Sequence, residues 1–315
     1  MFLTQTPEWT RRGTALVARI EAAFGARGVH GETMGLVLVE RGADGRPQGF
    51  SWRGDWRCYP CSLVKSFHLL HALDQLAQGR LKMHTDLDRA LRDMILWSSN
   101  TATNYVIDLL SGTTGDTLLE GAALEAWRDA REGLNRYFAA RDWPEFAGCN
   151  ITQKLMDDMR YGREAQYAGA AGEYLNVLTP LACARLMWEL YEGTDLGLPP
   201  AETARARDEM ARDRRDPRAS MSAYQLSEYL GGGMSEGTRL WSKAGHNTWT
   251  GDAASSYFKH DMMRWIRPDG RALIVVLMTQ GEETSVDDPM IFPEIGALLE
   301  AEFAAPVPQT AEALA

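Results

Sequence analysis

Residues 57–67 read RCYPCSLVKSF, and this stretch holds two motifs that predict different chemistry. Cys58 and Cys61 form a C-x-x-C, which is typical of a redox pair. Ser62 and Lys65 form an S-x-x-K, which is typical of a serine nucleophile with a lysine as its base. The surrounding elements and the other motifs of the chain decide between the two.

The S-x-x-K motif begins a predicted helix over residues 62–79, where a spacing of three places both side chains on one face. A second S-x-x-K, Ser256 with Lys259, falls in a predicted strand, where the same spacing points the side chains to opposite faces. Only Ser62 and Lys65 are therefore expected to exchange a proton directly. At the start of its helix Ser62 would lie beside unpaired backbone N–H groups, although serine also occurs there simply as a helix cap.

Hydrophobic periodicity and turn residues divide the chain into predicted helices and strands, with strands near both ends and helices between them. We therefore expect an α/β lobe built from residues 1–60 and 223–315, a helical lobe of residues 61–222 inserted into it, and an active site in the seam. The predicted helices cover residues 8–26, 62–79, 86–97, 101–110, 117–143, 179–193 and 289–303, the predicted strands cover 33–41, 46–54, 239–246, 252–260, 262–267 and 272–280, and residues 144–176 form a long loop.

Two further motifs favour the serine chemistry. WSSNTATN contains Ser98 and Asn100 as an S-x-N at a helix end, and SKAGH contains Lys243 and Gly245 as a K-x-G on a strand. In this order, S-x-x-K, S-x-N and K-x-G are the three signatures of the serine β-lactamase and penicillin-binding-protein superfamily, which the chain resembles over nearly its whole length. It looks most like the class A β-lactamase branch and is also similar to serine-type glutaminases. The resemblance implies an α/β plus all-α fold, with an antiparallel sheet flanked by helices and an inserted helical lobe.

The resemblance also implies roles for the motif residues. Ser62 would attack a carbonyl carbon and hold the acyl group, while Lys65, with a pKa lowered by burial and by Lys243, would take the serine proton. Ser98 would relay a proton to the leaving group. Asn100 would orient Lys65 and bind the substrate amide, and Lys243 would supply positive potential. Cys58 and Cys61 are then expected to be small buried residues beside the nucleophile, because a thioredoxin-like site has no use for the two downstream motifs.

By the same resemblance, the backbone N–H groups of Ser62 and His246 form the oxyanion hole, with Gly245 and Trp97 beside them. Relatives usually carry threonine or serine between the Lys and Gly of the third motif, where the hydroxyl holds a substrate carboxylate. Here that residue is Ala244. We therefore expect neutral substrates to be preferred, with His246 either replacing part of the missing contact or packing at a strand end.

Deacylation in class A enzymes uses a glutamate on a loop that follows the S-x-N helix. Glu164 in YGREAQY is the first candidate for this base and Glu173 in GEYLNV is the second. Lys65 serving both half-reactions is the third alternative. The spacing between Lys65 and Ser98 is tighter than in class A enzymes and residues 113–150 look expanded, so the rim of the pocket is expected to differ.

Composition narrows the function classes further. The net charge of −10 argues against nucleic acid and anionic membranes as partners, because both favour basic surfaces. The chain begins without a signal-peptide pattern and has four cysteines, so we predict a cytoplasmic protein. His68, His71 and Asp74 are spaced along one helix, but a solvated helical edge is expected there rather than a metal site. We predict no metal and no cofactor.

The sequence therefore predicts a serine hydrolase that acts through an acyl-enzyme on a small amide, lactam or ester. A glutaminase-like amidase and a transacylase are alternatives within the enzyme class. A non-catalytic binding or sensor protein of the same fold, which would stay acylated, is the alternative outside it. The sequence leaves the substrate's identity and the oligomeric state open.

Overall fold

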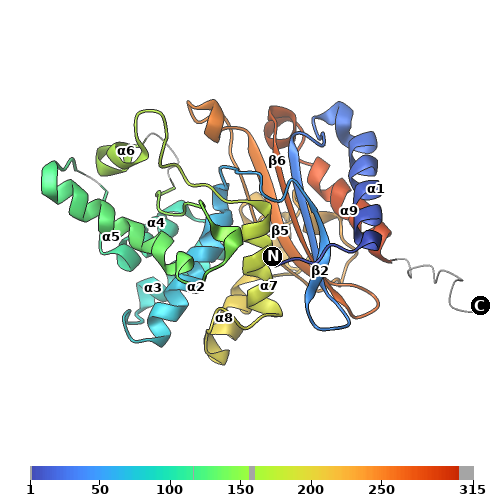
Figure 1. The fold of residues 1–315 in the computed structure, drawn as a ribbon, viewed down its shortest axis with the longest axis horizontal. Helices are drawn as coiled ribbons and strands as arrows, with labels where there is room; N and C mark the ends of the chain where they lie inside the picture. Colours follow the sequence, from blue (N-terminus) through green and yellow to red (C-terminus); the bar gives the residue numbers. More distant parts are fainter. Residues whose placement is uncertain (1, 116, 156–159, 305–315) are drawn as a thin grey trace, which may run out of the picture.

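A computed structural model describes residues 2–115, 117–155 and 160–304. Six strands and the helices around them make up the described chain (Figure 1). The strands are β1 (Met34–Arg41), β2 (Pro47–Trp52), β3 (Ala211–Arg212), β4 (Leu240–His246), β5 (Phe258–Ile266) and β6 (Ala272–Gln280). The α-helices are α1 (Pro7–Phe24), α2 (Val64–Ala77), α3 (Thr85–Leu96), α4 (Asn100–Ser111), α5 (Gly121–Ala139), α6 (Gly162–Ala168), α7 (Pro180–Tyr191), α8 (Pro200–Met210) and α9 (Ile291–Ala304).

The strands form one antiparallel sheet in the order β2-β1-β6-β5-β4-β3. β1 pairs directly with β6, with Val37 opposite Val276, so the two ends of the chain meet in the middle of the sheet. This arrangement confirms the predicted fold class, an antiparallel sheet built from both chain ends with helices around it.

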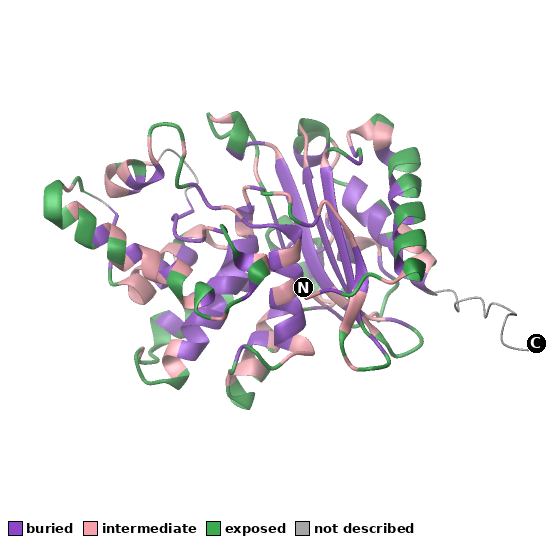
Figure 2. Cartoon of the chain, in the orientation of Figure 1, coloured by how far each residue is buried: buried purple, intermediate pink, exposed green. Residues whose placement is uncertain are grey.

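Alternate residues of the central strands enter two different cores, as the two-residue repeat of a strand requires. On β6, Val275 and Leu277 pack in the core that contains residues of α1 and α9, whereas Val276 and Met278 pack in the core that contains residues of α2 and α7. The sheet is therefore a buried middle layer between helices, and its strands are buried along most of their length (Figure 2). Helices α5 and α6 lie far from the sheet, at the other end of the molecule (Figure 1).

Two predicted segments differ from the observed elements. Residues 252–260 and 262–267 were predicted as separate strands, but the ladder with β6 runs unbroken from Phe258 to Ile266 and makes them one strand. The predicted long loop over 144–176 contains a 3-10 turn (Pro144–Phe146) and α6; its residues 156–159 lie outside the described part. The division into lobes at residues 60 and 223 stays a prediction, and α7, assigned to the helical lobe, packs on β1 and β6.

Helix α2 is buried on all sides from Val64 to Asp74, so the predicted solvated edge is wrong. His68 has no exposed surface, and His71 and Asp74 are 6% and 7% exposed, because α3, α4 and α8 all pack against this helix. The ring of His71 stacks on Tyr137 with centroids 3.8 Å apart. Burial lowers the pKa of both histidines to about 3, so they are neutral at neutral pH.

The described residues contain no cluster of three or more side chains that could hold a metal ion. Within the same residues, no helix has the length and apolar character needed to cross a membrane.

Candidate active site

Ser62 lies in a 3-10 turn (Cys61–Leu63) that runs directly into α2. Cys61, the residue before it, has a φ of +48°, a left-handed conformation that is uncommon for a residue with a side chain. Strained residues of this kind cluster at functional sites. Neither the turn nor α2 has a side-chain cap, so the hydroxyl of Ser62 is not used as a helix cap.

Strand β4 runs beside the Ser62 turn at very short range. A Cβ atom at position 245 would lie 2.5 Å from the backbone nitrogen of Ser62, so only glycine fits there. β3 pairs with β4 only at Leu240 and Trp241, so within the described chain residues 243–246 have no strand neighbour on the side away from β5. The K-x-G motif therefore presents an open strand edge next to the S-x-x-K motif.

The hydroxyl of Ser98 lies between two buried lysines. Its Oγ is 3.1 Å from Nζ of Lys65 and 3.0 Å from Nζ of Lys243. Lys65 also donates to the backbone oxygen of Ser98 and, at 2.7 Å, to Oδ1 of Asn100. A φ of +53° at Ser98 allows both its side chain and its carbonyl to reach Lys65. The three sequence motifs thus meet at one point.

Lys243 is held by neutral oxygen atoms. Besides Ser98 it donates to Oε1 of Gln225 and, at 2.6 Å, to the backbone oxygen of Ala244. Burial, with the neighbouring Lys65 as the next cause, lowers the pKa of Lys243 well below its usual value. Sequence reasoning missed Gln225, because it belongs to no motif and comes near Lys243 only through the fold.

The residues predicted to line the pocket lie around the end of β4. Ala244 is fully buried, and His246 at the exposed end of the strand has its Nδ1 2.7 Å from the hydroxyl of Tyr229. The ring of half-buried Trp97, next to Ser98 in sequence, packs edge-on against Tyr224 at 6.3 Å. Tyr229 was also missed, since nothing in its local sequence marks it.

Comparison with known proteins agrees with this geometry. A family profile described as "Beta-lactamase enzyme family" matches residues 84–303, which include the S-x-N and K-x-G motifs. The chain belongs to the β-lactamase enzyme family. It is a serine hydrolase, and the family predicted from the three motifs is confirmed.

Solved structures with the class A β-lactamase fold resemble this family member along almost their full length. The class A β-lactamase of the last common ancestor of Gram-negative bacteria (GNCA4) is 20% identical, with 92% of this chain and 99% of that one covered and a TM-score of 0.60. The protein PBP-A is 17% identical, with 92% and 96% covered and a TM-score of 0.60. None of the curated protein sequences matches the chain significantly.

The two cysteines of the C-x-x-C are buried thiols in this β-lactamase-family fold. Both are free, and burial raises the pKa of Cys58 and Cys61 far above the usual range. A thiol that stays protonated is a poor nucleophile and a poor redox group. Their packing next to the nucleophile agrees with the structural role predicted for them.

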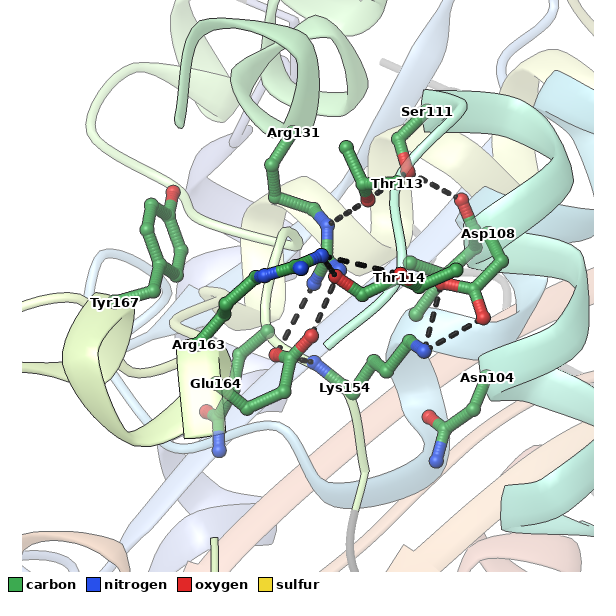
Figure 3. Close-up of polar contacts among 12 residues, drawn as sticks. Asn104, Asp108, Ser111, Thr113, Thr114, Arg131, Lys154, Arg163, Glu164 and Tyr167 are labelled. Atoms are coloured by element: carbon green, nitrogen blue, oxygen red, sulfur yellow. Dashed lines mark hydrogen bonds and ion pairs between the residues drawn. The ribbon is translucent and has the colours of Figure 1, made fainter. Parts of the chain in front are cut away.

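Glu164, the first candidate for the deacylation base, lies in a buried ion pair (Figure 3). Nη2 of Arg131 donates to its Oε1 at 2.7 Å and Nη1 donates to its Oε2 at 3.1 Å, with both side chains almost completely buried. The backbone N–H of Lys154 also points to Oε2, at 3.4 Å. The second candidate, Glu173, is exposed and accepts from the backbone of Ala171.

These contacts separate the predicted site residues into two groups. The structure brings together Ser62, Lys65, Ser98, Asn100, Lys243, Ala244, Gly245 and His246 around the end of β4. None of the contacts just described joins Glu164 or Glu173 to that group. The assignment of a deacylation base therefore stays a prediction.

Proposed function

We propose that this protein cleaves a small amide, lactam or ester through an acyl-enzyme on Ser62. The observation that carries the proposal is the hydroxyl of Ser98, which lies 3.1 Å from the amine of Lys65 and 3.0 Å from the amine of Lys243. Lys65 stands in the first turn of α2, the helix that follows the Ser62 turn. Two buried amines that share one hydroxyl form a route along which a proton can move between nucleophile and leaving group. We further propose a small molecule as the substrate; the cytoplasmic location stays a prediction from the sequence.

In the first half-reaction, Oγ of Ser62 bonds to the carbonyl carbon while its proton passes to the neutral amine of Lys65. The developing oxyanion accepts hydrogen bonds from the backbone N–H groups of Ser62 and His246. Gly245 supports this arrangement, since its lack of a side chain lets the β4 backbone come against the Ser62 turn.

Collapse of the tetrahedral intermediate breaks the substrate's C–N or C–O bond. The leaving group takes a proton from Ser98 Oγ, which is refilled from the neighbouring lysine amine. Lys243 favours formation of the anionic intermediate in the preceding addition step, because a proton on its amine supplies positive charge near the oxyanion. Its lowered pKa also lets it share the proton with Lys65.

In the second half-reaction, water attacks the acyl-enzyme ester and a base takes the proton of the water. The bond between the acyl carbon and Oγ of Ser62 then breaks, the base returns the proton to Oγ, and the free acid leaves. Glu164 and Glu173 are the carboxylates that the sequence offers for this step. The Arg131 guanidinium is hydrogen-bonded to both carboxylate oxygens of Glu164, and the side chain of Glu173 is exposed. We therefore assign the step to Lys65. Replacing each glutamate by glutamine and timing acyl-enzyme decay tests the assignment: a trapped intermediate in either variant would restore that glutamate as the base.

Substrate preference is expected to follow from Ala244, which has no hydroxyl to donate to a carboxylate. A hydrogen bond to a charged group contributes about 1.5–3 kcal/mol, so a site without it should lose about ten- to a hundredfold in preference for carboxylated substrates. We therefore expect a higher kcat/KM for neutral substrates than for matched carboxylates. Ala244→Thr should narrow this gap. Efficient cleavage of benzylpenicillin by the wild type would contradict this argument.

The proposed function is tested by a turnover screen over amides, lactams and aryl esters, with intact mass measured during the reaction. We expect turnover together with a transient adduct whose mass equals the protein plus the acyl group, and the loss of both in Ser62→Ala. Turnover that persists in Ser62→Ala would overturn the proposal.

A further inference from the structure

Gln225 is a buried residue of the site that belongs to none of the three motifs. Its Oε1 accepts a hydrogen bond from Nζ of Lys243. The other two oxygens to which Lys243 donates are Oγ of Ser98 at 3.0 Å and the backbone oxygen of Ala244 at 2.6 Å. Of these three acceptors, only the one on Gln225 can be changed without altering a motif residue or the backbone of β4.

The fold holds Gln225 in an uncommon backbone conformation. Its φ is +55°, in the left-handed region, and its backbone N–H donates to the carbonyl oxygen of Ser222 at 3.0 Å at the end of a 3-10 turn (Ser222–Tyr224). The residues on either side, Tyr224 and Leu226, are buried in the core that contains residues of α1 and α9. A conformation of this kind costs energy that the surrounding packing must offset, and such residues cluster at functional sites.

The three oxygens match the hydrogen-bonding capacity of a charged lysine. An ammonium group has three N–H donors, so the hydroxyl, the side-chain amide and the backbone carbonyl together satisfy all of them. A neutral acceptor stabilises the ammonium less than a carboxylate would. A primary amide can also turn and donate an N–H to the neutral amine. Gln225 is therefore able to pair with Lys243 in both of its protonation states.

Other charged or titratable groups also act on the proton of Lys243. They are Lys65 on α2, Arg212 on β3, Asp261 on β5, Cys61 in the Ser62 turn and His246 on β4 itself. Burial, followed by the two cations Lys65 and Arg212, lowers the pKa of Lys243 well below its usual value, and Asp261 opposes this shift. The carboxyl group of Asp261 accepts from the backbone N–H of Leu230 at 3.1 Å. The oxygen atoms that hold the Lys243 amine in place are thus neutral ones.

We propose that Gln225 is a positioning residue that holds Lys243 against Ser98 through a neutral hydrogen bond, so that the proton on Lys243 can leave and return during acyl transfer. Gln225 acts through Lys243 and takes up no proton itself. A carboxylate in its place would fix the proton on the amine, whereas an apolar side chain would leave one N–H of the ammonium unpaired. The inference rests on the proposed acylation of Ser62.

The test measures the rate constant for labelling of Ser62 by a fluorophosphonate as a function of pH in the wild type, Gln225→Glu and Gln225→Met. Lys65 and Lys243 titrate as a coupled pair, so the labelling rate should rise as the pair loses its first proton and fall as it loses the second. Gln225→Glu places a negative charge beside the amine, so the alkaline limb should move up by about 1–3 pH units. Gln225→Met removes the acceptor and should move the same limb down by about one pH unit.

Gln75→Glu is the matched control, because it adds the same charge about 15 Å further along α2 from Lys65, beyond the range of unscreened charge effects. Oε1 of Gln75 accepts from Nε of Arg80 at 2.6 Å, so the new carboxylate has a cation as its partner. We expect the wild-type pH profile in this variant.

The two Gln225 variants are expected to shift the alkaline limb in opposite directions, and if one of them fails to fold, the shift in the other decides. An alkaline limb that stays at the wild-type pH in a folded Gln225 variant would overturn the inference. Absence of labelling in the wild type at every pH would contradict the proposed function itself, whereas normal labelling with unshifted limbs contradicts only the role of Gln225.

Discussion

Two buried clusters of charged side chains lie at opposite ends of α4, and they hold their cations in different ways. The motif cluster (Ser62, Lys65, Ser98, Asn100 and Lys243) lies at the N-terminal end of the helix, and there Lys243 donates to neutral oxygens of Ser98, Gln225 and Ala244. The arginine cluster (Arg131, Glu164, Lys154 and Asp108) lies at the C-terminal end, where each cation has a carboxylate partner (Figure 3).

The difference separates a reactive site from a structural one. A cation that faces a carboxylate keeps its proton and fixes the surrounding chain, and removing one partner leaves a buried charge uncompensated. A buried amine that faces neutral oxygens gives up its proton readily, as the lowered pKa of Lys243 shows. We therefore expect changes in the motif cluster to alter rates and changes in the arginine cluster to alter stability.

The largest expected effect is that of Lys65→Ala. Removing the proposed proton acceptor should slow acylation of Ser62 about a hundred- to ten-thousandfold, the range typical of general-base catalysis. Lys154→Ala is the control from the arginine cluster and should acylate within a few-fold of the wild type while melting at a lower temperature. Equal losses of acylation rate in both variants would remove the distinction between the clusters.

Glu164→Gln should lower the stability of the protein and leave its acylation rate largely unchanged. Leaving Arg131 buried without its carboxylate should lower the free energy of unfolding by about 3–5 kcal/mol, measured by urea denaturation, while acylation of the folded enzyme continues. Glu125→Gln removes an exposed carboxylate paired with Arg128 and should cost less than about 1 kcal/mol. An unchanged stability of Glu164→Gln would show that the buried pair does not hold the lobe together.

Lys243→Ala should have a smaller kinetic effect than Lys65→Ala. Its loss removes positive potential near the oxyanion and a contact to Ser98, so we expect KM to rise and acylation to slow about ten- to a hundredfold. Pre-steady-state acylation rates at several substrate concentrations separate the two contributions. A larger loss of acylation rate in Lys243→Ala than in Lys65→Ala would exchange the roles of the two lysines.

An effect that is small near neutral pH and grows as the pH falls concerns the buried histidines of α2. His71 has a folded-state pKa of about 3, against about 6.5 when unfolded, so the unfolded chain binds a proton first as the pH falls. Its contribution to stability is complete above pH 6.5 and should be lost at up to about 1.4 kcal/mol per pH unit between 6.5 and 3. His71→Phe keeps an aromatic ring against Tyr137 and should flatten this part of the stability curve, measured by urea denaturation at several pH values. An unaltered slope would mean that other groups dominate it.

The fold and the motif cluster could be predicted from the sequence because both follow from patterns among residues that are close together in the chain. The short apolar run at residues 272–280 matched β6, and Ser62, Lys65, Ser98 and Lys243 stand in motifs of fixed order. The burial of His68 could not be foreseen, since it depends on helices α3, α4 and α8 packing around α2.

Contacts between segments that are distant in the chain could not be predicted from the sequence either. Arg131 and Glu164 meet across 33 positions, and Tyr229 and His246 across 17, with no motif to mark either pair. Such pairs follow from the folded arrangement alone, so local spacing carries no signal for them.

The most direct test of the central claim is to label the wild-type protein with a fluorophosphonate and map the adduct by peptide mass spectrometry. The account predicts one adduct on Ser62, absent in Ser62→Ala and formed much more slowly in Lys65→Ala. An adduct on Cys61 or Ser98, or labelling that survives in Ser62→Ala, would contradict it.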